Sequence, residues 1–312
     1  MSGVPDLRDI VKRVGGELVN GGREARVPGP GHSKRDRSLS LRSAADGRVL
    51  FHDFTGNHSV SEIRAHLGLS SGEGYQPTPA EARAAKRLRD AEAAALLAEK
   101  HAFCEQVWSQ TVEPAGTVVS AYLGARLLLS SEPSLVCPDI RFSPAAPRAV
   151  PWNRMKDDPP PPPPHPAMVC LARDHLGRAQ GLHVTYLDSR GRKAFGSRSR
   201  IMIGSMMGAS LQLAPISPDG TLAVGEGMET ARGFTLLRGV PTWATFSTSG
   251  LRNFVVPRGV RRLIIAADND ANGAGFAAAA DLAERARLTC DVEIEVPTAV
   301  GDDWADVWSR RA

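Results

Sequence analysis

Two aspartates near the C-terminus have a spacing that suits metal chemistry. Asp268 and Asp270 follow the apolar run 263–267, which predicts a buried strand, and they precede a Gly-containing loop and an Ala-rich helix expected over 276–287. On an extended chain, side chains at positions i and i+2 point the same way, roughly 6–7 Å apart. Hard cations such as Mg²⁺ prefer oxygen ligands, so the two carboxylates predict a cation site at the end of this strand.

Two other loop types share part of this sequence, and neither fits. The run DNDANG, residues 268–273, matches the first half of a calcium-binding EF-hand loop. That loop needs Glu at its twelfth position, where Ala279 stands, and a helix before it. The run GAGFAA, residues 273–278, is similar to a dinucleotide fingerprint, but there the first Gly should follow the strand directly. A solvated Asp-rich turn is the remaining alternative.

An upstream stretch repeats the same order of elements. The run TLAVGEGMETA, residues 221–231, gives an apolar strand, an acid at its end, a glycine and then a helix expected over 228–237. Glu226 stands where the strand ends. Glu229 falls in the first helical turn, where the helix dipole favours an acid, so we expect Glu229 to be structural.

The elements around these acids predict the fold class. Further strands are expected over 239–247 and 291–297. The order of strands and helices predicts an α/β fold, with a parallel sheet covered by helices on both faces. Ligands bind such sheets in the crevice outside the C-terminal ends of the strands, which is where Asp268 and Asp270 are expected.

Glu-Gly after one strand and Asp-x-Asp-x-x-Gly after a later strand resemble the Toprim domain shared by bacterial primases, topoisomerases and some nucleases. The resemblance covers about residues 220–312. In that family the Glu acts in acid–base or metal chemistry and the Asp pair binds Mg²⁺. The resemblance therefore implies Glu226, Asp268 and Asp270 as catalytic and metal-binding residues, with Mg²⁺ or Mn²⁺ as the cofactor. A further acid often follows the last strand, and Asp303 is our candidate for it.

Composition narrows the class of protein. A chain of 312 residues suggests two or three domains, and 42% hydrophobic with 23% charged residues is ordinary for a soluble protein. The net charge of +4 favours polyanionic partners. No apolar run approaches the ~20 residues of a membrane span, so we expect a cytoplasmic protein. The four cysteines are isolated, and no GxxxxGK[ST] motif indicates a fused P-loop motor.

The first segment, residues 1–70, predicts a helix over 6–14, a strand around 39–42, a turn at Asp46-Gly47, a strand over 49–54 and a helix over 60–67. With His32 and His52 near these strands, the segment resembles the zinc-ribbon domain at the start of bacterial primases.

The zinc-ligand positions of that family are only half filled. They fall at Gly29, His32, His52 and Thr55, and a structural zinc site needs four N or S ligands, so we expect no zinc. His58 is a possible substitute for one ligand. The basic residues of this segment are candidates for phosphate contacts: Lys34, Arg35 and Arg37.

Residues 71–111 connect this domain to the next. The Ser/Gly/Pro-rich run 71–78 predicts a linker, and a long helix is expected over 80–109. Residues 112–219 then predict a mainly antiparallel α+β subdomain. It has a helix over 115–123 and an irregular Pro-rich run over 144–166, followed by strands over 167–173, 179–187, 200–203 and 211–214.

Two features of this subdomain point to nucleic-acid chemistry. Five cations fall within 11 residues that contain no acid, and phosphates of a nucleotide or of DNA would neutralise them: Arg190, Arg192, Lys193, Arg198 and Arg200. The run AYLGAR, residues 121–126, resembles the Tyr-Leu-x-x-Arg that precedes the catalytic core of plasmid and phage primases.

Together these resemblances imply a primase of the plasmid or phage type. Such a nucleotidyltransferase makes short primers on single-stranded DNA from nucleoside triphosphates, and a separate replicative helicase is a possible partner. A Toprim nuclease would use the same acids to deliver water, and a non-catalytic DNA-binding replication accessory protein is the third alternative. A topoisomerase fits less well, because none of the tyrosines (Tyr75, Tyr122 and Tyr186) lies in a suitable partner domain.

Overall fold

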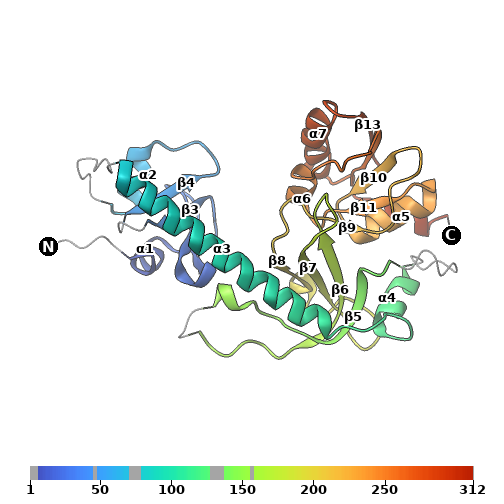
Figure 1. The fold of residues 1–312 in the computed structure, drawn as a ribbon, viewed down its shortest axis with the longest axis horizontal. Coiled ribbons are helices and arrows are strands. Elements are labelled where there is room, and N and C mark those ends of the chain that lie inside the picture. The colour runs from blue at the N-terminus through green and yellow to red at the C-terminus, as the bar shows by residue number, and fades with distance from the viewer. Residues whose placement is uncertain (1–5, 45–47, 70–78, 127–136, 155–157, 312) are drawn as a thin grey trace. The chain divides into compact units, whose positions relative to one another are not determined.

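The computed structural model describes residues 6–44, 48–69, 79–126, 137–154 and 158–311 (Figure 1). The chain forms two compact units, residues 1–98 with 149–162 and residues 99–148 with 163–312. The turn expected at Asp46-Gly47 and the linker expected over 71–78 lie outside the described residues. Among the described helices, none has the length and hydropathy needed to cross a bilayer.

The first unit is built on a four-stranded antiparallel sheet, ordered β1-β2-β3-β4. Leu39 and Leu41 of β3 point into its core, as their alternation predicts, and they pack with residues of the two short helices. β1 and β2 were missed in the sequence because they are short and joined by the tight Asn-Gly-Gly turn. The elements are α1 (Leu7–Val14), β1 (Glu17–Val19), β2 (Glu24–Val27), β3 (Leu39–Ser43), β4 (Val49–Asp53) and α2 (Val60–His66).

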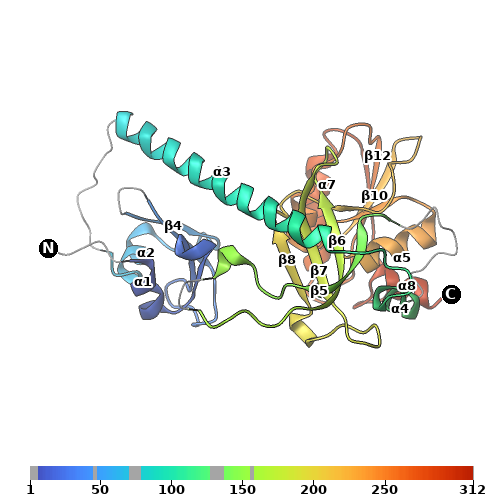
Figure 2. The same cartoon turned by 60° about the horizontal axis from the view of Figure 1, so that its bottom comes forward.

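The second unit contains a four-stranded antiparallel sheet, ordered β5-β6-β7-β8 (Figure 2). β6 and β7 are joined at residues 174–177 by the tight turn that the sequence predicts, with Gly177 at a φ of 80°. The elements before and within this sheet are α3 (Pro79–Ser109), α4 (Val118–Ala125), β5 (Ile140–Ala146), β6 (His165–Arg173), β7 (Ala179–Tyr186) and β8 (Arg200–Gly204).

The other sheet of this unit has the order β13-β12-β10-β11-β9. Its four C-terminal strands are parallel, as predicted, and β9 pairs antiparallel with β11. The strand expected over 211–214 therefore belongs to this sheet and not to the preceding antiparallel one. The strands are β9 (Leu211–Gln212), β10 (Thr221–Gly225), β11 (Thr242–Ala244), β12 (Arg262–Ala266) and β13 (Asp291–Glu295).

Helices cover both faces of the parallel sheet, which confirms the α/β prediction. Leu222 and Leu263 pack on one face beneath α6 (Thr248–Arg252) and α7 (Ala274–Ala286). The next residues of the same strands, such as Ala223 and Ile264, point to the other face, which α5 (Met228–Arg238) and α8 (Trp304–Ser309) cover.

One hydrophobic core joins the two sheets of this unit. Tyr122 of α4 and Met168 of β6 belong to the same buried cluster as Met228 and Ala231 of α5. Because packed interiors deform little, this shared core fixes the position of the antiparallel sheet relative to the strand ends of the parallel sheet.

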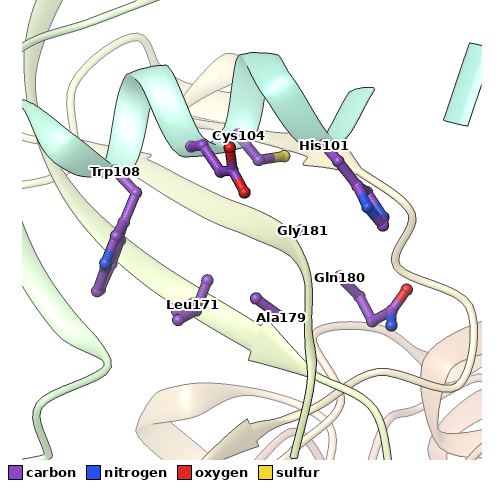
Figure 3. A pocket seen from close by; sticks show the side chains of 8 residues that line it. His101, Cys104, Trp108, Leu171, Ala179, Gln180 and Gly181 are labelled. Carbon is purple, nitrogen blue, oxygen red and sulfur yellow. The ribbon is translucent and has the colours of Figure 1, made fainter. Parts of the chain in front are cut away.

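A cavity of about 230 Å³ lies between α3 and the antiparallel sheet (Figure 3). His101, Cys104 and Trp108 line it from α3, and Leu171 and residues 179–181 line it from the sheet. None of the site residues predicted from the sequence lines this cavity, so it is separate from the chemistry described below.

Candidate active site

Glu226 lies directly after β10, at the C-terminal edge of the parallel sheet. The backbone N–H of Phe246, which follows β11, donates to the carbonyl oxygen of Glu226 at 2.6 Å. The side chain is half-buried, and burial together with the nearby charge of Asp270 raises the pKa of Glu226.

Asp268 and Asp270 follow β12, the neighbour of β10 in the sheet. The hydroxyl of Thr230 on α5 donates to Asp268 at 3.1 Å. Burial, and the carboxylates around it, raise the pKa of Asp268 to about 7. Asp270 is more exposed.

Gly275 allows α7 to begin against this loop. A Cβ atom at position 275 would lie 2.8 Å from the carbonyl oxygen of Asp268 and 3.2 Å from Oδ2 of Asp270. The first of these distances is shorter than non-bonded atoms tolerate. Glycine at this position therefore lets the helix pack beside both acids without displacing them.

Asp303 reaches the same edge of the sheet from the loop after β13. Its carboxylate caps α8 by accepting from the backbone N–H of Asp306 at 2.8 Å. Asn269 binds this loop through two backbone hydrogen bonds, one from its N–H to Asp302 at 3.1 Å and one from Gly301 to its carbonyl at 2.6 Å. The charge of Asp303 contributes to the raised pKa of Asp268, and burial raises the pKa of Asp303 itself.

These acids have the chemistry of an Mg²⁺ site but do not form a closed cage. No three His, Cys, Asp or Glu side chains in the described part of the chain are gathered closely enough to hold an ion by themselves. Mg²⁺ is commonly bound through one or two carboxylates plus substrate phosphates, so an open set of acids fits it. Burial is the main reason that the pKa values of Glu226, Asp268 and Asp303 are raised, and neighbouring carboxylates add to it, so a bound cation would favour the ionised forms.

Glu229 has a more specific role than the helix dipole predicts. Its buried carboxylate accepts from the Tyr122 hydroxyl, lies 2.8 Å from Nζ of Lys193 and lies 3.5 Å from the guanidinium of Arg200. Burial alone would raise the pKa of Glu229, but these partners lower it to about 2. Glu229 therefore anchors two predicted phosphate-binding cations three residues from Glu226.

Sequence reasoning missed this cluster because its members are far apart in the chain. Tyr122 lies on α4, Lys193 and Arg200 lie around the turn between β7 and β8, and Glu229 lies on α5. The only local signal was Tyr122 in the Tyr-Leu-x-x-Arg fragment, and nothing in that fragment identifies Glu229 as its partner.

The other predicted cations of this segment differ in their surroundings. Arg192 forms an ion pair with Asp188 at 3.0 Å, within the predicted turn. Arg190 and Arg198 have exposed side chains, and no ion pair in the described residues involves them.

We expect replacement of Glu229 by Gln to destabilise the protein by about 3 kcal/mol, because the change leaves a half-buried Lys193 without its counter-charge. Urea unfolding at pH 7 measures this difference. The folded-state pKa of Glu229 lies below its ordinary value of 4.5, so its stabilising effect is complete above about pH 4.5. The difference between the two proteins should therefore shrink as the pH falls towards 2.

Glu293→Gln is the matched control for this prediction. Glu293 pairs with Arg262 at 2.7 Å, but both side chains are about half exposed, so its loss should cost about 0–1 kcal/mol. If the Glu229→Gln and Glu293→Gln variants lost equal amounts of unfolding free energy, this would contradict the anchoring role of Glu229.

In the first unit, the histidines near the predicted zinc positions have partners other than metal. Nδ1 of His32 lies 2.9 Å from Asp36, and Nδ1 of His58 lies 2.9 Å from Asp53. The two rings meet edge to face, with centroids 5.1 Å apart. His52 instead lies against Phe54. Of the basic residues predicted here, Arg37 lies 3.4 Å from Glu17, and Lys34 and Arg35 are exposed.

We expect metal analysis of the purified protein to find well under one zinc per chain. Two of the four ligand positions, Gly29 and Thr55, offer no N or S ligand, whereas a structural zinc site needs four. Stoichiometric zinc that survives dialysis would contradict this expectation.

Comparisons with protein families identify two regions of the chain. Residues 98–213 match a family described as a domain of unknown function (DUF7146). Residues 221–312 match the Toprim domain, as the resemblance of Glu226, Asp268 and Asp270 to that family's motif predicts. No curated protein matches the chain.

Solved structures of primases match parts of this chain at low sequence identity. A DnaG primase catalytic domain bound to ssDNA has 15% identity over 69% of this chain and 77% of that one, with a TM-score of 0.46. The RNA polymerase domain of Mycobacterium tuberculosis primase DnaG has 16% identity over 69% of this chain and 78% of that one, with a TM-score of 0.41. A DNA primase domain from Pseudomonas aeruginosa has 16% identity over 45% of this chain and 46% of that one, with a TM-score of 0.33. The chain therefore spans less than half of that structure.

Proposed function

We propose that the Toprim domain and the antiparallel sheet before it form the catalytic core of a primase-like nucleotidyltransferase that makes short primers on single-stranded DNA. One observation carries this proposal. Glu226 and Asp268 lie at the strand ends of the Toprim sheet, and the charge of Arg200, which Glu229 holds together with Lys193, acts on Glu226. Joining two nucleotides needs this combination of carboxylates for metal and cations for phosphate.

The acids have distinct roles in the proposed reaction. Asp268 and Asp270 would hold Mg²⁺, and Asp303 supports them from the neighbouring loop. The bound metal supplies charge stabilisation to the nucleotide phosphates and lowers the pKa of an attacking 3′-hydroxyl. Glu226 is half-buried with a raised pKa, and it takes part either as a further ligand or as the group that accepts a proton.

The cations bind and orient the substrates. Lys193 and Arg200 would contact the triphosphate of the incoming nucleotide, because their anchor Glu229 is close to Glu226 in the chain. The exposed cations around the same turn would contact the DNA backbone: Arg190, Arg192 and Arg198. In the first unit the candidates for DNA contacts are Lys34, Arg35 and Arg37.

The direct test supplies single-stranded DNA, Mg²⁺ and labelled ribonucleotides or deoxyribonucleotides in separate reactions. Short products that begin with a nucleoside triphosphate would support the proposal. Cleavage of labelled DNA without incorporation would favour a Toprim nuclease. Binding without either reaction would favour an accessory protein. High enzyme concentrations and several templates should be used, so that weak activity or an unsuitable template is not taken for a lack of activity.

A further inference from the structure

Phe195 has a strained backbone in an otherwise ordinary loop. It lies between Lys193 and the short helix at Gly196–Arg198, and its φ is 65°. A bulky side chain seldom adopts this left-handed conformation, and such backbone strain persists only where the surroundings enforce it. The residue is nevertheless 39% exposed. Strain that keeps an apolar ring in contact with water suggests that the ring has a binding role.

The ring of Phe195 is held in a cluster of flat side chains. The guanidinium carbon of Arg148 lies 3.8 Å from the ring centroid, so the two groups are in close contact. His165 and Tyr186 meet the ring edge to face, at centroid distances of 4.7 and 5.8 Å. The Tyr186 hydroxyl donates to the carbonyl of Pro147 at 2.6 Å, which fixes the residue beside Arg148.

The charged groups around this cluster are arginines that are free to bind a phosphate. No ion pair in the described residues engages Arg148, so its N–H groups can donate to a phosphate while its plane contacts Phe195. Arg198, three residues from Phe195, is exposed and likewise has no carboxylate partner in the described part of the chain.

We propose that Phe195 and Arg148 form a stacking site for one base of single-stranded DNA, with the adjacent phosphate bound by Arg148 and Arg198. An aromatic ring beside a guanidinium provides the two contacts that single strands need, one to the base and one to the backbone. Duplex DNA cannot use the site, because both faces of its bases are covered. The inference rests on the proposed function only for the choice of DNA as the ligand.

The test measures binding of a short oligo-dT in EDTA by fluorescence anisotropy, so that no catalysis is needed. Phe195→Leu keeps an apolar side chain but removes the π-face, and it should weaken binding by about 5- to 150-fold. Phe195→Tyr should restore affinity to within about twofold. Phe276→Leu is the matched control and should leave affinity unchanged. Phe276 is an exposed phenylalanine of the same unit, and among the described residues no guanidinium lies over its ring.

Salt dependence separates stacking from charge. Arg148→Ala should lower the slope of log Kd against log salt by about one, whereas Phe195→Leu should leave the slope unchanged. Thermal melting of each variant checks that it is folded.

Two results would overturn the stacking site, and a third would separate it from the proposed function. An unchanged affinity in folded Phe195→Leu would exclude the site while leaving primer synthesis possible. An equal loss of affinity for a duplex of the same length would also exclude it. Loss of single-strand binding in a protein that makes no primers would support the site and contradict the proposed function.

Discussion

Replacing Glu226 by Gln is expected to lower the rate of primer synthesis by about 10²- to 10⁴-fold and to leave the affinity for single-stranded DNA unchanged. The substitution removes a charge and a proton acceptor beside Asp268 and Asp270. It alters none of the cations that we propose to contact phosphate. Primer synthesis under saturating DNA, together with a separate binding titration, measures the two effects.

Glu284→Gln is the control for Glu226→Gln, since Glu284 is exposed on α7 and the chemical change is the same. Its activity should equal that of the unchanged protein. If Glu226→Gln keeps full activity, Glu226 has no part in the reaction, and the alignment of the chain with the Toprim motif is wrong at this position.

Replacing both Asp268 and Asp270 by Asn is expected to abolish detectable binding of Mg²⁺ or Mn²⁺ in isothermal titration, because the change removes both negative charges of the proposed site. The paired replacement Asp281→Asn with Asp291→Asn removes two exposed carboxylates of the same domain and should leave metal binding intact. Equal metal binding by the two double variants would exclude the proposed ligands.

The pKa of Asp268 gives this metal site a pH dependence. Because that pKa is about 7, Asp268 is largely protonated at pH 6 and ionised at pH 8, so Mg²⁺ affinity should rise across this range. The effect of rising pH on the stability of the folded protein has the opposite sign. Between about pH 4 and 7 the folded protein holds a proton that the unfolded chain has lost, so ionisation of Asp268 lowers stability as the pH rises. At pH 8 without metal, the Asp268→Asn variant should therefore have a melting temperature no lower than that of the unchanged protein.

Much of the fold was predictable because the sequence carries strong local patterns. The run 221–237 and the run 262–287 each combine an apolar strand, a break and a helix, and these units appear in the parallel sheet as expected. Short strands were harder to predict from the sequence. β9 has only two residues, and no local pattern reveals that it pairs with β11 rather than with the sheet that precedes it in the chain.

The site was predictable where it depends on position along one strand, and unpredictable where it depends on packing between elements. Glu226 and Asp268 follow buried strands, so their place at one edge of the sheet follows from the topology. The partners of Glu229 come from three separate elements, and only the shared core brings them together. The Arg148 contact with Phe195 likewise joins residues 47 positions apart.

Two backbone hydrogen bonds join Asn269 to the Gly301–Asp302 loop. Because opening either loop breaks these shared bonds, we expect Asp268 and Asp303 to leave and rejoin the edge of the sheet together. Half-assembled sites, with one loop in place and one released, would then be rare. A ligand that selects the assembled state would order both loops in a single binding event.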